Sequence, residues 1–114
     1  MASPIAQFGV GTTVTDGATQ TFDCTSTSHF QWTLGASRTM STPTNVANGQ
    51  LIYIMVVQDA TGSRLVTWPS NFTWPAGTAP TLTTTASKAD LFFAVYDGIN
   101  AKWRANTVGL NYTL

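Results

Sequence analysis

Hydrophobic and polar residues alternate along several short segments of this chain. In residues 29–34, "HFQWTL", the apolar side chains Phe30, Trp32 and Leu34 are separated by polar neighbours. Successive side chains of a β-strand point to opposite faces, so this alternation predicts a strand with one buried face. The same pattern, less complete, predicts strands at residues 8–14, 19–24 and 101–108.

Two further segments are apolar at almost every position: residues 51–58, "LIYIMVVQ", and residues 90–96, "DLFFAVY". A strand of this kind must be covered on both faces, which places both segments at the centre of a sandwich or at a subunit interface. Residues 59–64, "DATGSR", follow as a predicted hairpin turn, in which Gly62 can adopt a positive φ. Residues 65–68 are then the returning strand.

Dipeptides that favour turns separate these segments, at residues 16–17, 48–49 and 97–98. Short strands are also predicted at residues 38–40 and, as an edge strand, at residues 81–85. We find no pattern typical of a helix. Short strands with turn signals about every eight to twelve residues predict an all-β fold, an antiparallel β-sandwich or jelly roll of about eight strands. We expect one domain over residues 8–114, preceded by an N-terminal arm at residues 1–7.

Composition narrows the possible partners. The chain has 114 residues, of which 43% are hydrophobic and only 9% are charged, and it contains no Glu. Its formal net charge is zero, so the basic surface that binds nucleic acid or an anionic membrane is not expected. No segment is apolar over the length of a membrane span or resembles a signal peptide. So few charges give little protection against self-association, which suggests a subunit of an assembly.

Candidate catalytic and metal-binding groups are scarce. The chain has one His, one Cys and five Asp, so we expect no metal and no other cofactor. The aspartates fall mostly at strand ends or in turns, where Asp accepts hydrogen bonds from backbone N–H groups. We expect His29 to be an outward polar residue and Cys24 a buried thiol. We do not expect an enzyme, although a Ser-His-Asp triad or a pair of carboxylates stays open.

The segment "LVTWPSNFTWPAGTAP", residues 65–80, contains two Trp-Pro pairs. The aromatic rings of Trp68, Phe72 and Trp74 could stack on sugar rings. Alternatively, Pro69 and Pro75 end short strands and stiffen a connection whose tryptophans are core residues. In a chain with so few catalytic or charged groups we favour the stiffened connection. Whether Trp68 and Trp74 face the core or a partner stays open.

Two stretches of the chain, residues 29–45 and residues 50–103, resemble a β-rich module found in virion proteins of tailed bacteriophages. The resemblance rests on "QDATGSR", on "WPAGTAPTL" and on "VYDGINAKW", in that order. The last motif has one residue more before its Trp than the resemblance leads us to expect. In such proteins the module often ends a tail fibre or appendage, and related small β-sandwich proteins decorate capsids.

Because only a short arm precedes the module, the resemblance favours a capsid decoration, or cement, subunit on the capsid exterior, made in the host cytoplasm. Its partners would be the major capsid protein and copies of itself, as a homodimer or homotrimer, without nucleic acid or membrane. The alternative is a receptor-binding module of a tail fibre that contacts host surface glycan; a hydrolase of surface polysaccharide is a third hypothesis. The predicted partner-binding residues are Met1, Ala2, Ser3, Pro4, Ile5, Trp68, Pro69, Phe72, Trp74 and Pro75.

Overall fold

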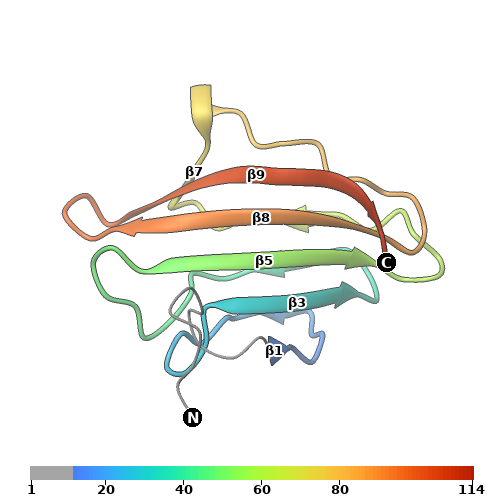
Figure 1. Ribbon diagram of the computed structural model, residues 1–114, viewed down its shortest axis with the longest axis horizontal. Helices are drawn as coiled ribbons and strands as arrows, with labels where there is room; N and C mark the ends of the chain where they lie inside the picture. Colours follow the sequence, from blue (N-terminus) through green and yellow to red (C-terminus); the bar gives the residue numbers. More distant parts are fainter. Residues whose placement is uncertain (1–11) are drawn as a thin grey trace, which may run out of the picture.

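The computed structural model describes residues 12–114 and contains two β-sheets packed face to face (Figure 1). The larger sheet has six strands in the order β1 (Thr12–Thr13), β3 (His29–Leu34), β5 (Leu51–Gln58), β8 (Lys88–Asp97), β9 (Lys102–Thr113) and β7 (Phe72–Thr73). The smaller sheet has the order β2 (Thr19–Gln20), β4 (Arg38–Met40) and β6 (Val66–Thr67). A short 3₁₀ turn, η1 (Pro75–Gly77), follows β7.

The first six strands alternate between the two sheets. Strands β1, β3 and β5 lie side by side in the larger sheet, and β2, β4 and β6 form the smaller one. Because the chain crosses to the other sheet after each strand, neighbours within a sheet run in the same direction, and all these pairings are parallel. The all-β class predicted from the sequence is confirmed, but the purely antiparallel sandwich is wrong.

The predicted hairpin at residues 59–64 is also wrong. The strand that follows it, β6, does not return beside β5 but joins the smaller sheet, where Val66 is paired with Arg38. The predicted positive φ of Gly62 is confirmed, since its φ is +72°. The turn packs on residues 83–87, and Ser63 N–H donates to the carbonyl of Thr84 at 2.7 Å.

Residues 81–85 do not form the predicted edge strand. The backbone groups of this segment do not pair with a neighbouring strand in these contacts. The carbonyl of Thr84 accepts the hydrogen bond from Ser63, and Thr83 N–H donates to Asp90 Oδ2 at 2.7 Å. Asp90 is 1% exposed, and its other oxygen accepts from Asn111 N–H. This buried carboxylate therefore holds the connection before β8 and the end of β9 together.

Strands β8 and β9 form a long antiparallel hairpin and are both longer than the sequence predicts. The motif "VYDGINAKW" has one residue more before its Trp than expected. The turn between β8 and β9 accommodates it: Asp97 is paired with Lys102, and Ala101 has a φ of +54°. Two register shifts beside Leu91 mark β-bulges toward the end of β9. Such bulges increase the local twist of the hairpin.

The core lies between the two sheets. Residues of β3 alternate between exposed and buried, so the predicted half-buried strand is confirmed. Trp32 and Trp103 are both 0% exposed and are the two largest fully buried side chains among the described residues. Cys24 is buried as predicted, and burial, followed by the nearby charge of Asp23, raises the pKa of its thiol to about 11.

Candidate functional site

The Trp-Pro segment folds back on itself so that its three aromatic rings contact one another. The rings of Trp68 and Phe72 are stacked with centroids 6.1 Å apart, and those of Trp68 and Trp74 meet edge to face at 5.2 Å. Phe72 N–H donates to the carbonyl of Pro69 at 3.0 Å, which closes the turn between the two tryptophans. The aromatic cluster is therefore a local structure that the spacing of the two Trp-Pro pairs permits.

This cluster packs against the core of the sandwich. Phe72 is only 7% exposed, and its ring lies 5.8 Å from that of Trp103. Trp68 and Trp74 are half-buried, and both meet Phe92 on the inner face of β8 edge to face. Each indole thus packs inward on one side and leaves part of its surface accessible to solvent.

A shallow hollow of about 280 Å³ lies beside the accessible side of Trp74. The hollow is formed where β7 pairs with β9, because this parallel pairing places Thr73 opposite Arg104. The hydroxyl of Thr73 donates to the carbonyl of Trp103 at 2.7 Å, which fixes the pairing. The hollow is lined by Thr73, Trp74, Pro75, Arg104 and Ala105.

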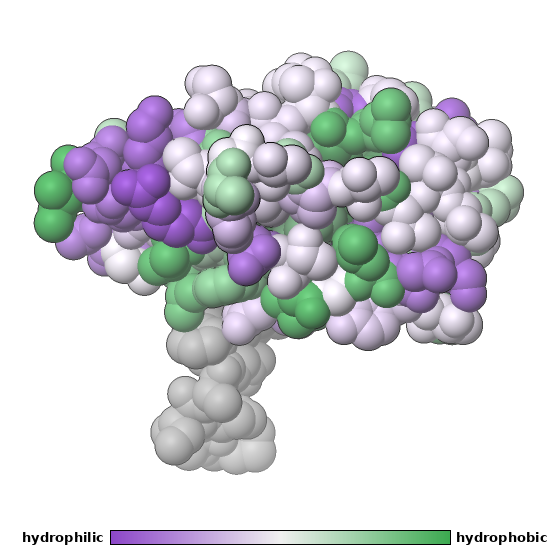
Figure 2. Space-filling model, turned by 90° about the horizontal axis from the view of Figure 1, so that it is seen from above, coloured by the Kyte–Doolittle hydropathy of each residue, from purple (hydrophilic) through white to green (hydrophobic). Residues whose placement is uncertain are grey.

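Polar groups surround this hollow on the side of the β8–β9 hairpin. The Arg104 guanidinium donates to Thr73 Oγ1 at 3.1 Å and to Asp97 Oδ2 at 2.9 Å. Hydrogen bonds from the side chain and backbone of Asn100, and then from Arg104, hold the pKa of Asp97 below its usual value. Hydrophilic side chains gather at this end of the molecule (left in Figure 2). Asp97 is therefore ionised at neutral pH and pairs with Arg104.

The arrangement combines a flat apolar surface with fixed hydrogen-bonding groups. Trp74 and Pro75 offer apolar contact, and the guanidinium of Arg104 and the hydroxyl of Thr73 lie next to them. Small-molecule sites generally consist of such apolar walls with a few polar groups that fix orientation. A ligand with an apolar face and hydroxyl groups at its rim fits this chemistry.

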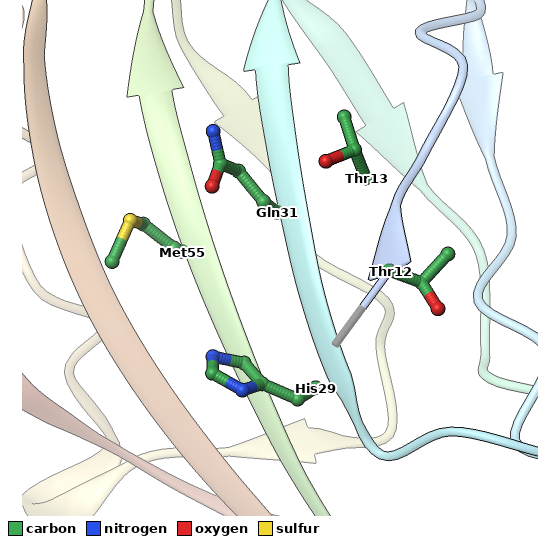
Figure 3. Close-up of a pocket in the computed structure, with 5 residues that line it drawn as sticks. All are labelled: Thr12, Thr13, His29, Gln31 and Met55. Atoms are coloured by element: carbon green, nitrogen blue, oxygen red, sulfur yellow. The ribbon is translucent and has the colours of Figure 1, made fainter. Parts of the chain in front are cut away.

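A second hollow, of about 310 Å³, lies on the outer face of the larger sheet. Figure 3 shows that it lies between β1, β3 and β5, with His29 and Gln31 on β3 and Met55 on β5. His29 is exposed, as the sequence predicts, and its ring contacts that of Tyr53 at 6.1 Å. Polar side chains form most of the lining of this hollow, and Met55 is its one large apolar residue.

The aspartates have the structural roles that the sequence predicts, with two exceptions. Asp23, Asp59 and Asp97 accept hydrogen bonds from backbone N–H groups in their own turns. The first exception is Asp90, which is buried. The second is Asp16, which pairs with Arg38 and accepts a hydrogen bond from the indole N–H of Trp32. Within residues 12–114 there is no group of three or more His, Cys, Asp or Glu that could hold a metal ion. In the same region no helix is long and apolar enough to cross a membrane.

The structure brings together only part of the predicted set of residues. Trp74 and Pro75 line the first hollow, whereas Phe72 lies in the core. The predicted residues of the N-terminal arm, Met1 to Ile5, lie outside the described residues. Sequence reasoning missed Thr73 and Arg104, because the pairing that joins them spans 31 positions of the chain.

Comparison with known protein families gives a match over most of the chain. Residues 12–101 match a family model described as "Putative phage tail fibre C-terminal domain". The match covers more than three quarters of the chain, includes the Trp-Pro segment and ends just before Arg104. No curated protein and no solved structure matches the chain.

Proposed function

Because this chain belongs to the family of phage tail fibre C-terminal domains, we propose that it contacts a glycan on the host cell surface. Family membership makes it a phage virion structural protein and agrees with the resemblance seen in the sequence. It supports the tail-fibre alternative better than capsid decoration. Neither the predicted binding to the major capsid protein nor the predicted place on the capsid exterior gains support from the match.

The hollow beside Trp74 carries the glycan proposal. A sugar ring has an apolar face of C–H groups, which can lie against the accessible side of the indole. Arg104 can donate hydrogen bonds to the hydroxyl groups of the sugar. Thr73 Oγ1, which lies 3.1 Å from the guanidinium, can accept one, because its own proton is donated to the carbonyl of Trp103. Because Asp97 neutralises Arg104 at 2.9 Å, the site suits a neutral sugar better than an acidic one.

We further propose that the site binds glycan without cleaving it. Glycoside hydrolysis generally uses two carboxyl groups about 5–10 Å apart on either side of the scissile bond. None of the five residues that line the hollow has a carboxyl group. Incubation of the protein with host polysaccharide should therefore release no new reducing ends, and release of such ends would contradict this part of the proposal.

The test of glycan binding uses quenching of tryptophan fluorescence by polysaccharide from the host. Arg104 is the residue to change, since its side chain is 48% exposed and its loss leaves the core intact. We expect Arg104→Ala to weaken binding at least about tenfold, the effect of losing a hydrogen bond to a charged group. The matched control is Arg64→Ala, which removes an Arg–Asp pair of the same 2.9 Å length at the opposite end of β8.

Two outcomes would remove the glycan proposal. One is the absence of any fluorescence response with host polysaccharide, and the other is equal weakening by the Arg104 and Arg64 variants. A separate measurement addresses the place of the protein in the virion. Immunogold labelling should detect a few copies at the tail; dense labelling of the head would favour capsid decoration instead.

A further inference from the structure

The turn between β8 and β9 lies next to the candidate glycan site but has no apolar anchor of its own. Its residues from Gly98 to Lys102 are all exposed, and Ile99, the large apolar side chain among them, is 87% exposed. Packing therefore does not hold this turn in one conformation. Hydrogen bonds must hold it, because a surface turn with few buried contacts otherwise opens easily.

Asp97 accepts the hydrogen bonds within this turn. Its Oδ1 accepts from the backbone N–H groups of Ile99 and Asn100, at 3.1 and 3.2 Å. Its Oδ2 accepts from the side chain of Asn100 at 2.8 Å and from the Arg104 guanidinium at 2.9 Å. The direction of this carboxylate therefore depends on how the turn is folded, and the place of the Arg104 guanidinium beside the hollow depends on the carboxylate.

A contact from another loop holds the turn from outside. Asn48, in the loop before β5, accepts with its Oδ1 from Gly98 N–H at 2.8 Å, although the two residues are 50 positions apart in the chain. Figure 1 shows both turns at the same end of the larger sheet (left). The fit is close, since a Cβ at Gly98 would lie 3.0 Å from Cβ of Asn48 and 3.1 Å from its Oδ1. A larger residue at position 98 would push Asn48 away.

The loop that carries Asn48 is itself held against β8 by backbone hydrogen bonds. Gly49 N–H donates to the carbonyl of Tyr96, and Tyr96 N–H donates to the carbonyl of Gln50, both at 2.8 Å. Gly49 has a φ of +83°, which glycine adopts without strain, and Gln50 N–H donates to the carbonyl of Ala47 at 3.0 Å. The side chain of Asn48 therefore extends from a fixed backbone beside the end of β8.

We propose that Asn48 is a positioning residue of the glycan site, which holds the β8–β9 turn so that Asp97 keeps Arg104 beside the hollow. Asn48 does not line the hollow and acts only through the turn. The expected effect on ligand affinity rests on the proposed function, whereas the effect on the pair of Asp97 and Arg104 is independent of any ligand. Because residues 45–50 carry no charge, removal of the Asn48 side chain changes the position of Asp97 without removing a charge near it.

The pKa of Asp97 tests the positioning role without a ligand. Carboxyl-carbon NMR titration should give a higher pKa for Asp97 in Asn48→Ala than in the unaltered protein, closer to the ordinary value of 3.8. The reason is that the hydrogen bonds that favour the charged carboxylate are weakened when the turn loosens. The charged residues of β9 beside this carboxylate, Lys102 and Arg104, are unchanged in the variant.

Affinity for host polysaccharide, measured by quenching of tryptophan fluorescence, tests the effect on the site. We expect Asn48→Ala to weaken binding roughly threefold to tenfold, the effect of losing one hydrogen bond between neutral groups. Asn48→Asp keeps an oxygen that can accept from Gly98 N–H and should restore most of the binding. In a protein that already carries Arg104→Ala, Asn48→Ala should weaken binding no further, because it acts through Arg104.

The matched control is Ser37→Ala. Ser37 Oγ is also an exposed acceptor of a distant backbone N–H, that of Leu65 at 3.0 Å, but it lies between β3 and β4. This variant should change neither the pKa of Asp97 nor the affinity. Circular dichroism shows whether each variant folds. If Asn48→Ala does not fold, Gly98→Ala disrupts the same contact from the other side.

Two results would overturn the proposal. One is an unchanged pKa of Asp97 in Asn48→Ala, and the other is weakening of binding by Asn48→Ala to the same degree with and without Arg104. Failure of the unaltered protein to bind polysaccharide would contradict the proposed function alone. In that case the titration of Asp97 decides whether Asn48 positions the pair.

Discussion

The two faces of the six-stranded sheet are formed by the same strands but differ in what covers them. On the inner face, Trp32, Ile54 and Phe92 are each 2% exposed or less, because the smaller sheet and its loops cover them. On the outer face, Tyr53 and Phe93 are apolar as well, yet no described strand covers them. Apolar composition alone thus does not show which face of a strand belongs to the core of its own chain.

Loss of a large inner side chain should have the greatest effect on stability. Trp32 is 0% exposed, contacts Phe22 edge to face at 5.4 Å and donates its indole N–H to Asp16 at 3.0 Å. We expect Trp32→Ala to lower the free energy of unfolding by about 4 kcal/mol, through lost burial and a cavity. Urea denaturation measures this change. A loss below about 1 kcal/mol would show that the inner face is not the main source of stability.

A smaller effect on stability is expected from replacing each of the two buried tryptophans of the inner face by Phe. The indole N–H of Trp32 has a partner, whereas that of Trp103 has none among the described residues. Loss of one partner of a buried hydrogen bond costs about 1–3 kcal/mol, a cost that applies to Trp32→Phe and not to Trp103→Phe, while both variants lose part of a buried ring. We therefore expect Trp32→Phe to destabilise more than Trp103→Phe in the same urea experiment. Equal losses of unfolding free energy in the two variants would mean that the hydrogen bond from Trp32 to Asp16 does not stabilise the fold.

On the outer face, substitution should have little effect on the monomer. Phe93 is half-buried and contacts Tyr53 at 5.9 Å. Phe93→Ser should lower the free energy of unfolding, measured by urea denaturation, by about 1 kcal/mol, the value of an aromatic pair. Loss comparable to that of Trp32→Ala would mean that the outer face is already covered within the single chain.

The smallest expected effect concerns pH. Burial raises the pKa of Asp16, but hydrogen bonds from Arg38, Gly35 and Trp32 outweigh it and leave the pKa below the ordinary value of 3.8. A lowered pKa in the folded state means that the contribution to stability is present above the unfolded pKa and is lost as pH falls through the folded one. Stability should therefore fall below about pH 4 by no more than about 1 kcal/mol from this group. Asp16→Asn should show a shallower decline in acid.

Much of the fold follows from local patterns in the sequence. Alternation predicts β3 with its correct buried face, and continuous apolar runs predict β5 and β8 as central strands, but not that the two pair with each other. Strand direction could not be predicted in this way, because it depends on where the chain goes after each strand. Residues 59–64 have the chemistry of a tight turn, but that chemistry is equally suited to a turn that leads into the other sheet.

The candidate site was predictable only in its aromatic half. Trp74 and Pro75 stand out in a sequence with few such pairs, and they line the hollow. Arg104 lies on a strand predicted for other reasons, and nothing near it in the sequence indicates a site. Its contact with Thr73 arises from the parallel pairing of β7 with β9, a long-range contact that no local pattern records.

The alternation of the first six strands between the sheets bears on the order in which the protein folds. Antiparallel β8 and β9 are joined by a short turn, so they can pair within microseconds. Each parallel pairing among the first six strands must instead first close a loop through the opposite sheet. Strand β5 also pairs with β8, and β8 is synthesised about thirty residues after β5. We expect nascent chains that end before β8 to be cleaved rapidly by protease, and the hairpin, made last, to serve as the template on which the earlier strands assemble.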